Sequence, residues 1–498
     1  MRVTNSMIFG NSVNNMIRNA RHINNLVQSI ETQKRFQRPS DDPILAGRAL
    51  RYRTFLSETE QFIQNAHTAS AWMEVTESAF LNILRGPESI MHRISTRLVH
   101  GATGSIEFND RMAVIAELSE IFHQLKTVEM NHSYMGRFVF SGFHTNHPPV
   151  LTGTMTPGTH FVMEQPLRFR DIETTIAFHR PPGPHSAHEL IPDTHILKLP
   201  FNGLDLTSAT PAGVPDLGLF QADGSTPLAI TLNVIQNSAT DPGAYRPVTV
   251  PLTVNFLADT GELIIPDEAL HLFEDGIVAR FANGEDATGA RNRFTEGMLN
   301  PMINFRSWDI TNPANVQSFN AAEHDFEMEI SVNSHVTINS HARDTLTPQL
   351  FADLKRLIEF AESLRVSDPR AIEAYFYGQG FRDEALDNEV NRFLTAEKQA
   401  FQDMLYSRFN NMIEFTERHV SQASTEHTRL GTRMARLDLL HVRLEENEVA
   451  FTALLSENED TDVPSAIIRK SNAEAAFRDA LRAIAMTTQL SLADFINR

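Results

Sequence analysis

The sequence contains no cysteine, which excludes disulfides, thiolate nucleophiles and zinc sites built from thiolates. It also contains no run of about eighteen apolar residues, the length that a membrane-spanning helix requires. The opening residues, MRVTNSMIFG, do not form the continuous apolar segment of a cleaved secretion signal. We therefore expect no membrane insertion, and expect any export to use an uncleaved signal and another route.

Positive charge is scarce: 43 Lys and Arg stand against 62 Asp and Glu, for a net charge of -19. This balance argues against a nucleic-acid partner, because neutralising phosphates requires clustered cations. The first 53 residues reverse the balance, with only three acids (Glu31, Asp41 and Asp42) among the cations Arg2, Arg18, Arg21, Lys34, Arg35, Arg38, Arg48, Arg51 and Arg53. Such a basic end predicts contact with a membrane, a nucleic acid or acidic neighbours, or a role in export.

Catalytic and cofactor motifs are missing too. There is no Gly-Lys of the Walker type, no G-x-G-x-x-G, no G-x-S-x-G and no His-Glu-x-x-His. Close histidine pairs (His144 with His147, His185 with His188) have no acidic ligand at a suitable offset, so we expect structural or solvated roles rather than a metal site. The acidic run Glu323, Asp325, Glu327 and Glu329 predicts a solvated strand face. We expect no cofactor and no enzyme activity.

What the sequence does have is helical periodicity at both ends. Between residues 9 and 30, apolar or small residues recur at alternating steps of four and three, a pattern typical of a helix that packs on a partner helix. These residues form the N-terminal seam: Phe9, Val13, Met16, Ala20, Ile23, Val27 and Ile30.

A proline-flanked turn, RPSDDP, ends this helix. Within it, Asp42 before Pro43 predicts an N-cap followed by proline at the first helical position. We expect the turn residues Arg38, Pro39, Asp41, Asp42 and Pro43 also to contact a neighbouring subunit. A second seam then follows: Ala49, Tyr52, Leu56, Thr59, Ile63, Ala66, Ser70, Met73, Glu77, Phe80 and Leu84.

The C-terminal side mirrors this arrangement. One seam runs through Thr416, Val420, Ala423, His427, Leu430, Met434, Leu437, His441, Leu444, Glu448, Phe451 and Leu455. His427 and His441 on it are predicted to pack or to bond a partner. The stretch SENEDTDVP, with Asp460 and Asp462, breaks this helix. A last segment carries the remaining expected interface residues: Phe477, Leu481, Ile484, Leu492 and Phe495.

The middle of the chain changes to a period of two, as in Val248, Val250, Leu252, Val254 and Phe256, between turn signals such as Asp223-Gly224. The predicted fold is α+β, with long N- and C-terminal helices around an inserted β-rich domain. We expect an inner domain (1–42 and 460–498), a helical rod (43–144 and 383–459) and an outer domain (145–382) with a helix near 347–364.

The terminal seams are narrow, and isolated helices of this length are marginal in water. We therefore predict that residues 1–40 and 463–498 are largely disordered in the free subunit. They would become helical when several subunits supply partners, which points to assembly through the chain termini.

Several stretches are similar to the flagellar hook-associated protein 3 family, related to the flagellins. They are MRVTNSMIFGNSVNNM, TQKRFQRPSDDPILAGRALRYR, AWMEVTESAF, NHSYMGRFVFSGFHTNHPPV, RLGTRMARLD, LLSENEDTDVPSAI and SLADFI, within about residues 1–150 and 400–498. Pro464 departs from the family, which more often has a helix former there, and this departure falls at the start of the last helix. The middle half resembles the family only vaguely.

The resemblance implies a secreted, extracellular structural subunit of the bacterial flagellum, exported by the flagellar type III apparatus with an export chaperone. Implied partners are copies of itself, hook-associated protein 1 and flagellin, between which such subunits form the hook–filament junction. Two alternatives stay open: a minor flagellin, which would polymerise into long filaments, and an unrelated coiled-coil binding protein or enzyme, which would have ordered termini.

Overall fold

The structure, a computed structural model, describes residues 5–151, 161–179, 189–199, 217–238, 241, 243–246, 248, 250, 252–282, 299–300, 304–309 and 325–496. The chain divides into two compact units. The terminal unit comprises Met1–His67, Glu329–Ser334 and Leu437–Arg498. The central unit comprises Thr68–Met328 and His335–Arg436. The predicted α+β class is confirmed, with long helices at both chain ends and β-strands between them.

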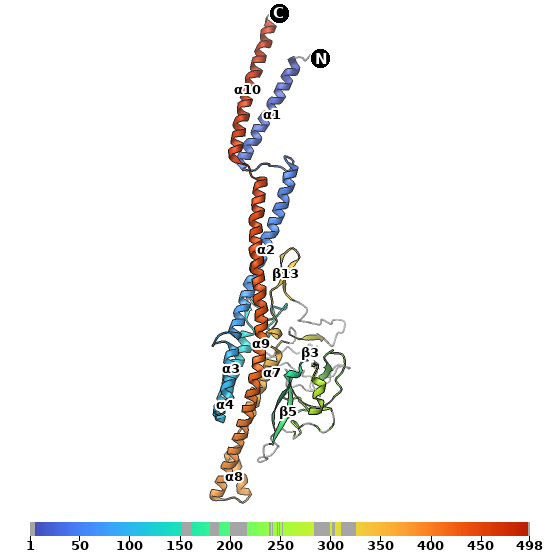
Figure 1. The fold of residues 1–498 in the computed structure, drawn as a ribbon, viewed down its shortest axis with the longest axis vertical. Helices are drawn as coiled ribbons and strands as arrows, with labels where there is room; N and C mark the ends of the chain where they lie inside the picture. The colour runs from blue at the N-terminus through green and yellow to red at the C-terminus, as the bar shows by residue number, and fades with distance from the viewer. Residues whose placement is uncertain are drawn as a thin grey trace. The chain divides into compact units, whose positions relative to one another are not determined.

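The terminal unit is built from helices. The helix α1 (Asn5–Thr32) packs against α10 (Val463–Ile496), and Figure 1 shows the two beside each other. The unit also holds the start of α2 (Pro43–Leu84) and the end of α9 (Asp383–Glu459). In the single chain, α1 and α10 are helical partners of each other. The predicted disorder of the free subunit stays a prediction.

The two long seams are confirmed as the inner faces of α2 and α9, since none of their predicted residues is exposed. Within the terminal unit, Ala49, Leu437 and Leu444 are buried. The ring of Phe55 contacts that of Phe451, with centroids 5.5 Å apart. Heptad spacing therefore identified the packing surfaces correctly.

The central unit adds shorter helices: α3 (Ile90–Gly101), α4 (Phe108–Gln124) continued by a π-turn (Leu125–Glu129), α6 (Ala342–Thr345), α7 (Pro348–Ser363) and α8 (Pro369–Gly378). The helix α7 lies in the range predicted for a helix near 347–364. Aromatic pairs join these helices to one another and to α9, as in Phe122 of α4 with Phe351 of α7 and Phe108 of α4 with Phe401 of α9. The core of the unit is thus shared between segments far apart in sequence.

Two larger sheets lie in the central unit, each with a non-sequential strand order. One has five strands, in the order β4 (Glu173–His179), β5 (Glu189–Lys198), β9 (Glu262–Ile265), β8 (Thr253–Leu257) and β7 (Thr231–Ile235). The other has four, in the order β11 (Arg306–Asp309), β3 (Phe161–Leu167), β10 (Ile277–Ala282) and β6 (Leu217–Gln221). Pairings are antiparallel except that of β7 with β8.

Two small hairpins complete the strands: β1 (Ser133–Tyr134) with β2 (Arg137–Phe138), and β12 (Glu327–Ser331) with β13 (Ser334–Thr337). On β12, Glu327 and Glu329 are exposed, as predicted for the acidic run, and Glu323 lies outside the described residues. These acids form a solvated strand face rather than a paired-carboxylate site.

The expected alternation of buried and exposed residues fails on β8, where all five residues are buried. Asn255, a polar position, is buried because its side-chain Nδ2 donates to the carbonyl oxygens of Gly243 and Arg246 at 3.1 and 2.9 Å. A loop covers the face that the pattern assigned to solvent. Local periodicity carries no information about such a cover.

The chain enters and leaves the β-rich region at adjacent points of the central unit. The backbone amide of Ala342 donates to the carbonyl of Phe140 at 2.7 Å, and that of Gly142 to the carbonyl of Ser340 at 3.3 Å. Phe140 in turn packs on Phe80 of α2, with ring centroids 5.2 Å apart. Ends this close are the geometry expected of a domain inserted into a helical framework.

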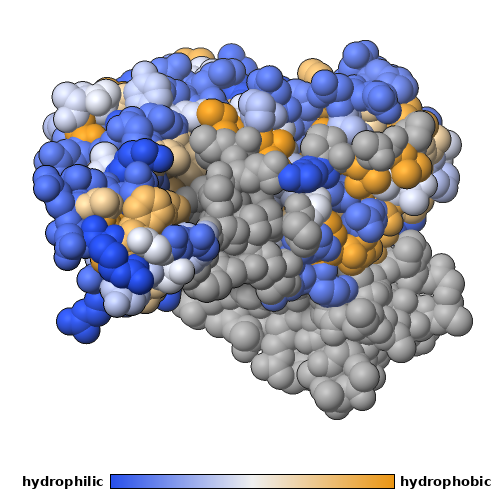
Figure 2. Space-filling view, turned by 90° about the horizontal axis from the view of Figure 1, so that it is seen from below, coloured by the Kyte–Doolittle hydropathy of each residue, from blue (hydrophilic) through white to orange (hydrophobic). Residues whose placement is uncertain are grey.

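The surface combines polar and apolar side chains, and Figure 2 shows hydrophobic residues in separate patches among hydrophilic ones. In the described part of the chain, no helix has the length and apolar character needed to cross a membrane.

Candidate assembly interface

Two short connections meet in the terminal unit, 33–42 between α1 and α2 and 460–462 between α9 and α10. We call their meeting point the joint. The amide of Arg35 donates to the carbonyl of Glu459 at 2.7 Å, and the amide of Thr461 to the carbonyl of Gln33 at 2.8 Å. Lys34 and Asp460 thereby face each other across an antiparallel bridge. Gln33 has a φ of 58°, a left-handed conformation that lets the chain turn out of α1.

Ion pairs surround this bridge. Lys34 Nζ lies 2.6 Å from Asp460 Oδ1 and 3.4 Å from Glu459 Oε2. Arg53 Nη2, on α2, lies 2.8 Å from the same Glu459 oxygen. The carboxylate of Glu459 is only 4% exposed, whereas Lys34 and Asp460 are both 44% exposed. The buried carboxylate of Glu459 is therefore paired with two cations, Lys34 from the connection between α1 and α2 and Arg53 from α2.

The protonation states at the joint follow from these contacts. The hydrogen bond from Lys34 is the main cause that lowers the pKa of Asp460, and the Ser456 hydroxyl adds to it. The same bond to Asp460 raises the pKa of Lys34, against a smaller opposing effect of burial. Both partners are therefore held charged at neutral pH. Close by, buried Asn458 donates from Nδ2 to the carbonyl of Leu45 at 2.9 Å.

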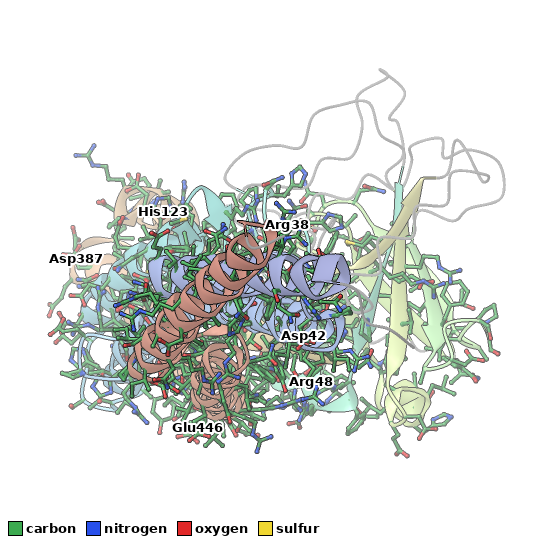
Figure 3. The ribbon with its side chains drawn as sticks, turned by 90° about the horizontal axis from the view of Figure 1, so that it is seen from above. Arg38, Asp42, Arg48, His123, Asp387 and Glu446 are labelled. Carbon is green, nitrogen blue, oxygen red and sulfur yellow. The ribbon has the colours of Figure 1, made fainter. Side chains whose placement is uncertain are left out.

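The predicted N-cap at Asp42 is confirmed. Its Oδ1 accepts from the amides of Ile44 and Leu45 at 3.1 and 3.0 Å, and α2 begins at Pro43. Asp41 Oδ2 accepts from the amides of Gln37 and Arg38, which closes the preceding turn. Figure 3 labels Arg38 and Asp42. Arg38, Pro39, Asp41 and Pro43 are exposed, and Asp42 is half-buried.

The last helix begins in the same way. The carboxylate of Asp462 accepts from the amide of Ser465 at 3.4 Å, and the amide of Ala466 donates to the Asp462 carbonyl. The helix starts at Val463, so Pro464 occupies its first turn. Proline is compatible with this turn because the first helical amides have no intrahelical acceptor. The departure at Pro464 is therefore accommodated.

The seam residues of α1 and α10 are only partly covered in the single chain. Val13, Met16, Ile23, Val27 and Ile30 on α1 are half-buried, and Ala20 is exposed. On α10, Phe477 and Ile484 are half-buried and Leu481 is exposed. Asp460 is half-buried and Asp462 exposed. Phe9, Leu492 and Phe495 fall within these helices, but their side chains lie outside the described residues.

The central unit contains a different group of charges, which we call the buried charge cluster. Arg356 on α7 pairs with Glu173 of β4 through Nη1 and lies 3.0 Å, measured from Nε, from Glu262 of β9. Arg356, Glu173 and Glu262 are each less than one-tenth exposed. Tyr245 donates to Glu262 at 3.2 Å, and Asn411 of α9 donates to Glu173 at 3.0 Å. The cluster therefore joins the five-stranded sheet to α7 and α9.

Burial and charge compete inside the cluster. Burial opposes ionisation of Glu262, but the charges of Arg356 and Lys198 outweigh it and lower the pKa of Glu262. Burial lowers the pKa of Lys198. Burial also raises the pKa of Asp353, although His419 favours the carboxylate. Asp353 accepts from Gln349 at 3.1 Å.

Two cavities lie near these residues and helices in the central unit. The cavity beside the cluster has a volume of about 10 Å³, which is the room of a single water molecule. A groove of about 730 Å³ between α3 and α4 is open to solvent and contains the exposed ion pair of Arg97 with Glu117. Among the described residues, no group of three His, Asp or Glu side chains is placed to hold a metal ion.

The seam histidines pack, as predicted. The ring of His427 lies on Phe80, with centroids 5.7 Å apart, and its Nε2 is 3.9 Å from Glu77. The ring of His441 meets that of His67 at 4.5 Å. His144 packs edge-on to Phe143. His185 and His188 lie outside the described residues.

Sequence reasoning missed Lys34, Arg53, Asn458 and Glu459 as joint residues. The signal available was the basic N-terminal stretch opposite the acidic SENED sequence, but nothing local indicates which cation meets which acid. It also missed the buried charge cluster entirely.

Comparison with known proteins agrees with the helical N-terminal region. Residues 3–145 match the bacterial flagellin N-terminal helical region. The flagellar hook-associated protein 3 of Salmonella typhimurium is 26% identical over 174 residues, which cover 33% of this chain and 51% of that protein. The protein of the same name from Escherichia coli is 23% identical over 122 residues, 24% of this chain and 37% of that protein.

The predicted resemblance to hook-associated protein 3 is confirmed. The chain spans about half the length, or less, of these curated relatives. Solved structures that resemble the fold include a putative flagellar hook-associated protein from Vibrio parahaemolyticus (11% identity, TM-score 0.37, 84% of this chain and 100% of that one). Another is the flagellar junction protein FlgL from Legionella pneumophila (11% identity, TM-score 0.31, 84% and 100%).

Proposed function

We propose that this chain is a structural, non-catalytic subunit of the bacterial flagellum that assembles through α1 and α10. Its place would be the junction layer between hook-associated protein 1 and the flagellin filament, outside the cell. It would reach that place through the flagellar type III export apparatus with the help of a chaperone. The similarity to hook-associated protein 3 and the match of residues 3–145 to the flagellin N-terminal helical region support this assignment.

The observation that carries the proposal is the half-covered seam of the terminal helices. Residues such as Val13, Ile23 and Phe477 are spaced for burial on a helical partner, yet they stay half-exposed when α1 has only α10 beside it. A large apolar side chain gains about 1.5–3 kcal/mol when it is fully buried. Neighbouring subunits would supply the missing cover.

The proposed domains follow the same logic. Residues 1–42 and 460–498 would form the inner, assembling part, 43–144 and 383–459 the rod, and 145–382 the outer part. The joint lies at the boundary between the first two. In this proposal its hydrogen bonds and ion pairs set the angle at which the terminal helices leave the rod.

The test is a strain that lacks this gene and is complemented with the wild-type chain or with a Val13→Asp, Ile23→Asp variant. Electron microscopy of the deletion strain should show hooks without filaments, with flagellin released into the medium. The variant should fail to restore filaments although it is produced and exported. Normal filaments in the deletion strain would refute the proposed junction role.

A minor flagellin is the second candidate, because residues 3–145 match the flagellin N-terminal helical region. The two differ in how far assembly proceeds. A flagellin extends into long filaments when the purified chain is concentrated, whereas a junction subunit stops at a short oligomer or ring. Sedimentation and electron microscopy of the purified chain separate these outcomes.

A further inference from the structure

The first turns of α2 present a basic stripe to solvent. Ile44, Arg48 and Arg51 lie at spacings of four and three residues, so they share one face of the helix. All three are exposed, and Ile44 is 70% exposed. Within the described residues, no ion pair involves Arg48 or Arg51. The charges that they carry are therefore available to an outside partner.

The last part of α9 presents a mainly apolar stripe that carries one acid, Glu446, and is flanked by exposed Arg443; we call it the acidic stripe. Leu439, Val442, Glu446 and Val449 recur at steps of three and four on one face. The three apolar members are 74%, 53% and 70% exposed. Buried Leu437 and Leu444 belong to the seam, and the stripe is displaced from them around the helix. It therefore faces away from the packing that α9 makes with α2.

Neither stripe is typical of a helix surface that stays in water. Apolar residues at helical spacing normally face a core, and a row of them on the outside marks an interaction site. One stripe combines an apolar residue with two cations, and the other combines three apolar residues with an anion. Figure 3 labels Arg48 on α2 and Glu446 on α9 and shows them apart from each other on the terminal unit. They are complementary without being each other's partner in the same chain.

We infer that the basic stripe of one copy docks on the acidic stripe of a second copy of this chain. This inference rests on the proposed function and specifies the contact that holds neighbouring subunits together. Because the two stripes are different surfaces, the contact is head-to-tail. Head-to-tail contacts close into a ring when the rotation between copies allows it. Each copy then offers one stripe to each neighbour.

Charge reversal tests this directly. The Arg48→Glu variant and the Glu446→Lys variant should each weaken self-association of the full chain about tenfold or more, because like charges then meet in the contact. The chain that carries both changes should recover most of the wild-type association, because every contact again pairs opposite charges. Sedimentation velocity over a range of concentrations measures all three. Matched controls are Arg85→Glu and Glu60→Lys, which reverse exposed charges off the stripes.

The double variant also shows whether the two stripes contact each other between copies. If self-association of the double variant is at least as defective as that of either single variant, Arg48 and Glu446 do not face each other between copies and the inference is refuted. If association of all variants equals that of the wild type, the stripes carry no contact and the inference is refuted.

Cross-linking gives an independent readout, since the chain has no cysteine of its own. One preparation carries Arg48→Cys and the other Glu446→Cys, so a disulfide between the two kinds of chain must join two copies. Oxidation of the mixture should give a mixed dimer in high yield, and an Arg85→Cys preparation in place of the first should not. No mixed dimer from chains that do associate refutes this contact, whereas wild-type chains that do not associate at any concentration count against the proposed function itself.

Discussion

The joint of the terminal unit and the buried charge cluster of the central unit both hold distant segments together with ion pairs, yet their surroundings differ. At the joint, Lys34 and Asp460 remain 44% exposed, and the adjacent seams are half-open. In the cluster, Arg356 is 4% exposed and its partners are equally buried. The central unit encloses the charges of its cluster, whereas the terminal unit leaves apolar surface for others to cover.

This difference teaches where each unit obtains its stability. Buried ion pairs cost solvation and hold only when every member is paired, so the cluster fixes one arrangement of sheet and helices. Exposed ion pairs contribute little by themselves. We therefore expect the order of the terminal unit to depend on neighbours, which is the property that an assembling end requires.

The largest effect should come from breaking the cluster. Arg356→Ala removes the cation that pairs directly with the buried carboxylates of Glu173 and Glu262, which should destabilise the chain by about 3–5 kcal/mol. Guanidinium-induced unfolding followed by circular dichroism measures the loss. Arg365→Ala, an exposed arginine just beyond α7, is the control and should change stability little. A loss below about 1 kcal/mol for Arg356→Ala would show that the cluster does not fix the central unit.

A smaller effect is expected at the joint. Glu459→Ala removes the buried anion shared by Lys34 and Arg53. The free energy of local opening at the joint should therefore fall by about 1–3 kcal/mol, so that the joint opens more often. Hydrogen exchange of the Arg35 and Thr461 amides reports this opening, because both donate across the joint. Glu457→Ala, an exposed neighbour, serves as the control. Unchanged exchange in Glu459→Ala would mean that the backbone bonds alone hold the joint.

Removal of the cap should have a still smaller effect on the monomer. Asp42→Ala takes away the acceptor for the amides of Ile44 and Leu45 and should cost about 1 kcal/mol. Asp42→Asn keeps an acceptor and should retain most of that stability. We expect Asp42→Ala to reduce assembly of purified subunits, measured by sedimentation, more than it reduces thermal stability. A larger loss of thermal stability than of assembly would argue against an assembly role for the RPSDDP turn.

Acid should affect the two regions in opposite directions. Asp460 has a pKa lowered from the usual 3.8, so its stabilising contribution is present above that value and is lost as pH falls through its folded-state pKa. Asp353 has a pKa raised from 3.8 by burial. Its contribution therefore grows as pH falls from above its folded-state pKa toward 3.8. NMR titration of the carboxyl carbons measures the pKa of each group, and the Asp353→Asn and Asp460→Asn variants identify the two signals. If both pKa values differed from 3.8 in the same direction, this prediction would be wrong.

The elements that the sequence predicted well are those whose signals are local. The seams of α2 and α9 follow from heptad spacing, and the cap at Asp42 follows from an acid placed before Pro43. Both features need only residues within one or two turns of each other. The break before α10 likewise follows from a local signal, the stretch SENEDTDVP.

The parts that sequence could not predict depend on residues brought together from far apart. Lys34 and Asp460 are 426 residues apart in the chain, and no spacing rule connects them. On α7, Gln349, Asp353 and Arg356 share one face, a polar stripe that ordinarily predicts a solvated surface. The five-stranded sheet and α9 cover that stripe instead. Such burial is a property of the topology, not of the helix.

The main-chain bridge at the joint has one more consequence. Its two hydrogen bonds, from Arg35 to Glu459 and from Thr461 to Gln33, join peptide groups and so do not discriminate among side chains. The charges at 34 and 460 can change during evolution while the crossing of the two connections is kept. A chimera with both connections exchanged for those of a distant homologue should therefore keep the crossing of the two connections.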